Sequence, residues 1–333
     1  MTPGGPVLEV RNLRTHIATP RGTVRAVDDV SLRLEPAEAL GVVGESGSGK
    51  SVLARAVMGL LPRTAASSGE VLFQGRDLLS LSRRERSRIW GTRIALVFQD
   101  PGRSLNPVVR VERQLTEGMR RQLGVSRAEA RTRALGLLDE VGVPDPERRL
   151  RAYPHELSGG MRQRVVIATA LACEPDLLIA DEPTTALDVT VQRQILDLLR
   201  RIQRERGMAL ILISHDLAVV AGRTDRVAVM YAGRIAETGP TRAVFEVPHH
   251  RYTRALLDST PTLAHERHTP LQLIPGSLPD PTRPPAGCRF APRCGYAEED
   301  CTTLGAHLTD VRPGHHVACA HPVVALGGVP HGR

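Results

Sequence analysis

The stretch that decides the fold is Gly44-Glu45-Ser46-Gly47-Ser48-Gly49-Lys50-Ser51. It matches the pattern G-x-x-x-x-G-K-[ST], follows the apolar run Ala39–Val43 and opens a helical pattern over residues 50–60. Glycines let a backbone wrap closely around phosphate groups, and successive N–H groups at a helix start attract the anion. Lys50 would bring a compact positive charge to the β- and γ-phosphates, and the Ser51 hydroxyl would bind Mg²⁺. The stretch therefore predicts a nucleoside-triphosphate site; the less specific alternative is a flexible Gly/Ser turn.

Lys50 is also the only lysine of the 333-residue chain, which carries 44 basic side chains against 36 acidic ones. All other bases are arginine, and acidic residues interrupt them, as in Arg83-Arg84-Glu85-Arg86. Proteins that bind single-stranded nucleic acid stack bases on aromatic side chains, which make up only 3% of this chain. The net charge of +8 is therefore weak evidence for a nucleic-acid partner, and we expect none.

The composition is that of a globular protein, with 41% hydrophobic and 24% charged residues. No uncharged apolar run approaches the roughly 20 residues of a membrane-spanning helix. Residues 1–6 lack the basic-then-apolar pattern of a signal peptide. We therefore expect a cytoplasmic protein whose role at a membrane, if it has one, is peripheral.

A second chemical motif is Leu177-Leu178-Ile179-Ala180-Asp181-Glu182, an apolar strand that ends in two carboxylates. Asp181 is expected to hold the Mg²⁺ shell, and Glu182 to polarise the attacking water as a general base. An ordinary strand that ends in an acidic turn is the alternative. Strand and helix patterns alternate from here to residue 231, which predicts an α/β fold with a mainly parallel, helix-covered sheet. Residues 108–150 are rich in Arg and Glu at helical spacing and indicate an inserted helical subdomain.

Between these motifs lies Leu157-Ser158-Gly159-Gly160-Met161-Arg162-Gln163-Arg164, which resembles the signature of ATP-binding cassette (ABC) ATPases. Gln99 resembles the Q-loop glutamine of that family, Thr185-Ala186-Leu187-Asp188 its D-loop and His215 its switch histidine. The resemblance implies a P-loop NTPase fold in which the signature of one subunit covers the phosphate loop of another. It therefore implies a dimer that ATP closes and hydrolysis opens.

The resemblance also implies roles for individual residues. The implied catalytic residues are Lys50, Glu182 and His215, of which His215 would contact the γ-phosphate. Mg²⁺ would be held by Ser51, Gln99 and Asp181. The family commonly stacks the adenine on an aromatic residue ahead of the phosphate loop, but Thr15-His16-Ile17-Ala18-Thr19-Pro20 contains no Phe, Tyr or Trp. Either His16 or Ile17 takes that place, or the adenine is held loosely. The implied ATP-binding residues are Gly44, Glu45, Ser46, Gly47, Ser48, Gly49, Lys50, Ser51, Gln99 and Asp181; the signature residues that act on the partner are Ser158, Gly159, Gly160 and Gln163, and Asp188 belongs to the D-loop.

A closer resemblance, to the ATPase subunits of dipeptide and oligopeptide importers, is carried by residues 98–107, 153–164 and 180–190, by His250-Arg251-Tyr252 and by Ile274-Pro275-Gly276. It implies an ATPase at the cytoplasmic face of the membrane, with two permeases, an extracytoplasmic solute-binding protein and a second ATPase subunit in a heterodimer. An importer of nickel or an oligosaccharide is one alternative. A DNA-repair ATPase of the same superfamily is another. Such ATPases carry coiled-coil or zinc-finger insertions, and residues 108–150 are too short for the first and free of the cysteine needed for the second.

The C-terminal part differs in character, since four of the five cysteines and eleven of the 25 prolines lie past residue 260. We expect an ATPase domain over residues 1–258, with a helical subdomain at about 101–165, and a loop-rich extension over 259–333. Disulfides are disfavoured in a reducing cytosol, and a coreless extension is typically stabilised by a metal. The four cysteines, Cys288, Cys294, Cys301 and Cys319, lack the short pairs typical of zinc sites.

The wide cysteine spacing suits a [4Fe–4S] cluster better, and the resemblance implies one here, because similar importer subunits carry it at this location. Zinc, or no metal at all, remains an alternative. Histidines such as His307, His315 and His316 could replace a thiolate. Cys173 is expected to be a buried core residue.

Overall fold

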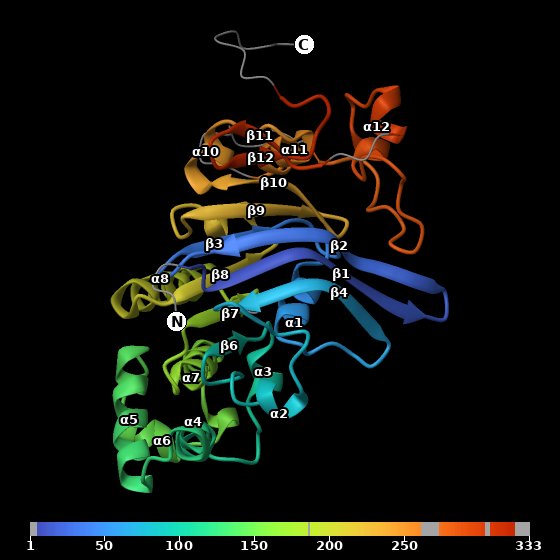
Figure 1. Ribbon diagram of the computed structural model, residues 1–333. Coiled ribbons are helices and arrows are strands. Elements are labelled where there is room, and N and C mark those ends of the chain that lie inside the picture. Colours follow the sequence, from blue (N-terminus) through green and yellow to red (C-terminus); the bar gives the residue numbers. More distant parts are fainter. Residues whose placement is uncertain (1–4, 186, 261–272, 304–306, 324–333) are drawn as a thin grey trace.

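The computed structural model describes residues 5–185, 187–260, 273–303 and 307–323. Its central feature is a sheet of eight strands in the order β11-β12-β10-β9-β3-β8-β7-β6 (Figure 1). The five strands from β9 to β6 pair in parallel, and β9 to β11 pair antiparallel. The strands are β3 (Ala39–Val43), β6 (Ile94–Val97), β7 (Leu177–Asp181), β8 (Ala209–Ser214), β9 (Arg226–Tyr231), β10 (Arg234–Pro240), β11 (Thr309–Arg312) and β12 (His315–Val317).

The parallel strands carry almost continuous apolar runs because helices or the second sheet cover both of their faces. Every residue of β3, β7 and β8 is buried. The sequence prediction of a parallel, helix-covered sheet is confirmed for this half of the molecule. The phosphate loop leaves the carboxyl end of β3 and enters α1 (Lys50–Val57).

A second sheet, which the sequence pattern does not separate from the first, contains four antiparallel strands in the order β2-β1-β4-β5. The sequence pattern does not indicate β4, because residues 66–70 at its start are polar or small and exposed, so they show no alternation. The β1–β2 hairpin projects past the end of the central sheet (Figure 1). The strands are β1 (Leu8–Thr19), β2 (Gly22–Leu34), β4 (Ala65–Phe73) and β5 (Arg76–Asp77).

The region in which a helical subdomain is predicted is largely helical, and its helices lie below the sheet in Figure 1. Its buried residues are continuous with one face of the central sheet, so it forms no separate core. The helices there are α3 (Pro101–Ser104), α4 (Val111–Gly118), the π-helix η1 (Met119–Leu123), α5 (Arg127–Glu140), α6 (Pro146–Arg151), the 3₁₀ helix η2 (Pro154–Glu156) and α7 (Gly159–Leu171). The other helices are α2 (Arg83–Arg86), α8 (Val189–Arg206), α9 (Leu217–Val220), α10 (Thr241–Glu246), α11 (Arg251–Asp258), η3 (Ala291–Arg293) and α12 (Glu299–Thr303).

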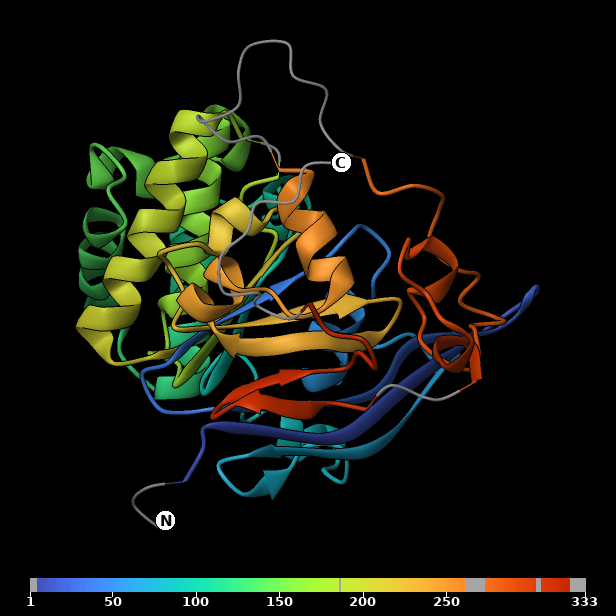
Figure 2. The same ribbon diagram turned by 90° about the horizontal axis from the view of Figure 1, so that it is seen from above.

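The C-terminal extension is joined to the central sheet by backbone pairing. Strand β12 pairs with β10, with Val317 opposite Glu237. Glu237 is fully buried and accepts hydrogen bonds from the N–H groups of His249 and His250 and contacts the ring of His315, all within 3.0 Å. In Figure 2 the orange part of the extension lies beside the blue β1–β2 hairpin. No helix among the described residues is long and apolar enough to cross a membrane.

Candidate functional site

The phosphate loop has a backbone path that requires glycine at two positions. Gly44 has φ +150°, and a Cβ there would stand 2.1 Å from the carbonyl oxygen of Met230. Gly49 has φ +104°, and a Cβ there would stand 2.2 Å from the carbonyl oxygen of Ala26. The loop is therefore held tightly between β9 and β2, as a preformed phosphate cradle requires.

Lys50 lies inside this loop. Its ammonium donates hydrogen bonds to the carbonyl oxygens of Gly44 at 2.8 Å and Glu45 at 2.9 Å, and the residue is only 4% exposed. Burial lowers the pKa of Lys50, and the nearby carboxylates of Glu182 and Asp181 oppose that effect. The structure thus places the single lysine where an anion on the loop would meet its charge.

Ser51 and Asp181 form the expected pair, since the Ser51 hydroxyl donates to Asp181 Oδ1 at 2.8 Å. Asp181 is 2% exposed, and burial raises its pKa while the Ser51 hydrogen bond lowers it. A hydroxyl beside a carboxylate at the end of a strand suits Mg²⁺, which prefers oxygen ligands. Gln99, the third expected Mg²⁺ ligand, contacts Glu182 instead of this pair.

Glu182 is the centre of a polar cluster beside the phosphate loop. Its Oε2 accepts hydrogen bonds from Gln99 Nε2 at 2.9 Å and Thr185 Oγ1 at 3.0 Å, and it lies 3.2 Å from His215 Nδ1. The residue has φ +46°, a conformation that non-glycine residues rarely adopt and that concentrates at functional sites. The structure therefore brings Glu182 and His215 together, places Gln99 with them rather than with the Ser51–Asp181 pair, and adds Thr185, the first residue of the D-loop motif.

The signature residues lie at the start of α7. Ser158 caps α7 by accepting a hydrogen bond from the N–H of Met161 at 3.3 Å, and Asp188 caps α8 in the same way. Ser158 and Gly159 are exposed, as contact with a partner would require. Gln163 does not fit that role, because it is 1% exposed and lies one turn further on, on the buried face of α7.

A cavity of about 1030 Å³ opens beside the phosphate loop. The phosphate loop, Gln99 and Glu182 line one part of it, and the β1–β2 hairpin lines another, from Ile17 to Ala26. A third part is residues 278–282 of the C-terminal extension, which the sequence did not indicate. These residues lie in an irregular, proline-rich stretch, so neither periodicity nor a motif marked them as part of a site.

The extension also binds the phosphate loop directly, through Arg293. Its guanidinium forms a two-pronged ion pair with the Glu45 carboxylate, at 2.7 and 3.1 Å, and its side chain is 6% exposed. This hydrogen bonding raises the pKa of Arg293. The backbone N–H of Glu45 donates to the Tyr252 hydroxyl at 2.8 Å. Glu45, expected only as an ATP-binding residue, therefore ties the loop to the C-terminal part of the chain.

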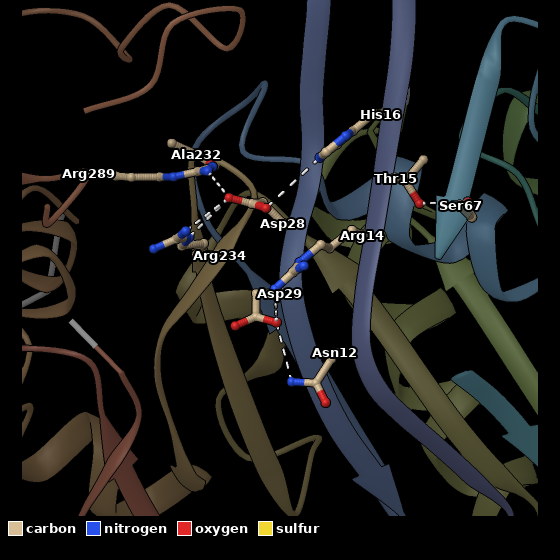
Figure 3. A network of polar contacts seen from close by, with 10 residues as sticks. All are labelled: Asn12, Arg14, Thr15, His16, Asp28, Asp29, Ser67, Ala232, Arg234 and Arg289. Atoms are coloured by element: carbon tan, nitrogen blue, oxygen red, sulfur yellow. Dashed lines mark hydrogen bonds and ion pairs between the residues drawn. The ribbon is translucent and has the colours of Figure 1, made fainter. Parts of the chain in front are cut away.

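A second link between extension and ATPase is the buried carboxylate of Asp28 in β2 (Figure 3). It accepts hydrogen bonds from Arg289 and from Arg234, the latter at 3.0 Å, and the side chains of Asp28 and Arg289 are 8% and 5% exposed. Burial raises the pKa of Asp28, but the two arginines outweigh it and hold that pKa below its usual value. Burial lowers the pKa of Arg289 to about 10, so it stays charged at neutral pH.

Asp28→Asn should lower the free energy of unfolding by about 3 kcal/mol, because it leaves Arg289 buried without its counter-charge. Asp29→Asn is the matched control: Asp29 is 30% exposed and pairs with the exposed Arg14, so the change should stay within about 0.5 kcal/mol. Urea unfolding at neutral pH measures both. Because the folded pKa of Asp28 is lowered, this contribution is full above its ordinary pKa and is lost as the pH falls through the lowered value. Equal losses in the two variants would contradict the assignment.

The four cysteines of the extension line one small cavity. The N–H of Cys288 donates to the carbonyl of Cys301 at 2.8 Å, and burial raises the pKa of the Cys288 and Cys319 thiols. His315 and His316, named as alternative ligands, face Glu237 and Asp310 instead. His321, which the sequence pattern did not indicate, lines the cavity and with Asp300 and Cys301 forms a group whose ligand atoms lie within 4.8 Å of one another. Cys173 is 8% exposed, which confirms it as a core residue.

Comparison with known proteins agrees with this geometry. Residues 27–185 match the family model of ABC transporters, and residues 236–301 match that of the oligopeptide/dipeptide transporter C-terminal region. The oligopeptide transport ATP-binding protein OppD of Salmonella typhimurium is 49% identical over 324 residues, covering 97% of this chain and 96% of that protein. OppD of Escherichia coli is 49% identical over 320 residues, covering 96% and 94%.

Among solved structures, a dimeric bacterial ABC transporter cassette superimposes with a TM-score of 0.64 at 28% identity, covering 71% of this chain and 99% of the cassette. The same cassette has been solved as a dimer in a post-hydrolysis state with ADP and phosphate. The two family models and the similarity of fold therefore indicate the same family. The chain belongs to the ATP-binding subunits of ABC transporters, in the oligopeptide/dipeptide transporter family.

Proposed function

We propose that this chain is the ATP-hydrolysing subunit of an ABC importer that takes up dipeptides and oligopeptides. The observation that carries the proposal is the cluster beside the phosphate loop, where Glu182 meets Gln99 and His215 next to the Ser51–Asp181 pair. The peptide substrate rests on the relatives, which are named for oligopeptide transport.

In the proposed ATP hydrolysis each residue of the site has a separate role. The loop amides and Lys50 would bind the β- and γ-phosphates. Ser51 and Asp181 would hold Mg²⁺, which would supply positive charge beside the phosphate oxygens. Glu182 accepts a proton from the attacking water, while Gln99 and His215, both in contact with its carboxylate, keep it oriented. Ser158 and Gly159 are exposed and available to cover the γ-phosphate of a partner subunit.

The partners follow from the same proposal. A second ATPase subunit completes each nucleotide site, and two permeases at the membrane receive the motion of the helical subdomain. A solute-binding protein outside the membrane selects the peptide. The chain itself then sits at the cytoplasmic face of the membrane as a peripheral subunit.

Uptake of labelled solutes tests the substrate class. A strain without this gene should lose most uptake of a labelled tripeptide and regain it with the wild-type gene. Uptake of nickel and of an oligosaccharide should stay unchanged in the same strain. Loss of nickel or oligosaccharide uptake with normal tripeptide uptake would overturn the peptide assignment.

Purification of the protein from cells with whatever is bound to it tests the DNA-repair alternative. Recovery of the protein with DNA rather than with permeases would favour that alternative.

We propose, further, that Cys288, Cys294, Cys301 and Cys319 hold a [4Fe–4S] cluster. Convergence of all four thiols on one cavity supports the proposal, since a cluster of this kind takes four thiolate ligands. The cluster would supply folding energy to a segment that has little core of its own. A site for a single metal ion is the second candidate, because ligand atoms of Asp300, Cys301 and His321 lie within 4.8 Å of one another.

Protein purified without oxygen should be brown and contain about four irons and four sulfides per chain. Cys294→Ser should lower the iron content strongly, whereas Cys173→Ser, outside the quartet, should leave it unchanged. A colourless protein with one zinc per chain would contradict the cluster and support the single-metal site.

A further inference from the structure

We propose that residues 278–282 of the C-terminal extension form one wall of the nucleotide site in the same chain, and that Leu278 and Ile17 hold the nucleobase. This inference rests on the proposed ATP-binding function. The extension would then be part of the ATP site itself. Leu278 and Ile17 would take the place of the aromatic stacking residue that is absent from residues 15–20.

No aromatic side chain lines the cavity among the described residues. His16, one of the two candidates for base stacking, does not line it either; its ring is directed toward Asp28, 4.0 Å away (Figure 3). Ile17, the other candidate, lines the cavity and is half-buried. The apolar side chains that a base in this cavity can pack against are therefore all aliphatic.

The segment 278–282 supplies the opposite wall. Leu278 is half-buried, and its Cδ1 lies 3.4 Å from where a Cβ of Gly47 would stand, so the side chain rests against the phosphate loop. Further along, the N–H of Arg25 donates to the carbonyl of Pro281 at 3.0 Å. The methyl group of Thr282 lies 3.9 Å from a Cβ built on Gly22, at the turn of the β1–β2 hairpin. The segment thus runs from the phosphate loop to that hairpin, along the region that a nucleoside would occupy.

Arg293 fixes the segment 278–282 relative to the phosphate loop. The guanidinium that pairs with Glu45 of the phosphate loop also donates to the carbonyl oxygens of Pro275 at 2.7 Å and Ile274 at 3.3 Å. One buried cation therefore holds both the loop and the start of the segment that leads to Leu278. Ligand sites are typically built this way, with apolar walls that are positioned by a few polar contacts.

Leu278→Ala tests the inference with two ligands. The wall contacts the nucleoside, so the variant should bind MgATP about fivefold more weakly, while inorganic tripolyphosphate, which needs only the loop, should bind as in the wild type. Ile17→Ala should show the same pattern, and Leu278→Met should restore ATP binding. Leu273→Ala is the matched control, because Leu273 lies on the same extension and is 81% exposed. Calorimetry measures all four variants.

Unchanged ATP affinity in Leu278→Ala would overturn the inference. Equal weakening of ATP and tripolyphosphate would overturn it as well, because the leucine would then only support the loop. Failure of the wild type to bind ATP at all would instead refute the proposed function, so the two failures are distinguishable. Normal tripolyphosphate affinity also shows that a variant is folded.

Discussion

Glu182→Gln should bind MgATP as tightly as the wild type and hydrolyse it at least about 100-fold more slowly. In the proposed mechanism the carboxylate accepts the proton of the attacking water, and an amide of the same shape cannot take that proton. Glu182 Oε2 already lies within 3.2 Å of Gln99, Thr185 and His215, so its position is fixed and the substitution changes the chemistry more than the geometry. Phosphate release and nucleotide binding, measured on the same preparation, separate the two effects.

Mixed with the proposed second ATPase subunit, the same variant should collect in an ATP-bound dimer, because ATP would close the pair and slow hydrolysis would no longer open it. Size-exclusion chromatography with and without MgATP measures this. Glu205→Gln is the matched control, since Glu205 is 54% exposed on α8 and pairs only with Arg201, one turn away. Full turnover in Glu182→Gln would remove this residue as the general base. Loss of ATP binding would show that it holds the nucleotide instead.

The sequence predicts the catalytic part of the site well because each chemical requirement there restricts the residue and its spacing. A phosphate cradle needs glycines and one lysine, and Mg²⁺ needs oxygen ligands at the end of a strand. Lys50, Ser51 and Asp181 therefore stand out by residue type and spacing alone, and the fold places all three together. Parallel strands are equally readable, because burial on both faces makes them apolar throughout.

The links between the extension and the ATPase could not be predicted in this way. Asp28, Arg289 and Arg293 are charged residues of ordinary type, and only the tertiary fold buries them against a partner far along the chain. Leu278 sits in a stretch without periodicity, so its contact with the phosphate loop leaves no local signal. Gln163 shows a related limit: a motif names a residue, but the helical turn decides which way its side chain points, and Gln163 is 1% exposed in this chain.

Lys50→Arg should lower ATP affinity and turnover by about 100-fold or more, although it keeps the charge. The Lys50 ammonium lies within 2.9 Å of two loop carbonyls and is 4% exposed. A guanidinium is planar and bulkier, and room for it would require Gly44 to move. Gly44 cannot yield, because its Cα already packs against the Met230 carbonyl so closely that a single added carbon would stand 2.1 Å from that oxygen.

The composition of the chain supplies the control for this prediction. Every other base is arginine, so the chain uses arginine wherever a base need only be charged. Arg84→Lys, on the exposed face of the short helix α2, should therefore leave ATP affinity and turnover unchanged. Nucleotide binding and phosphate release in the two variants make the comparison. Near-normal turnover in Lys50→Arg would mean that the phosphate loop requires only a positive charge at position 50. The presence of lysine there, in a chain whose other bases are arginine, would then need another explanation.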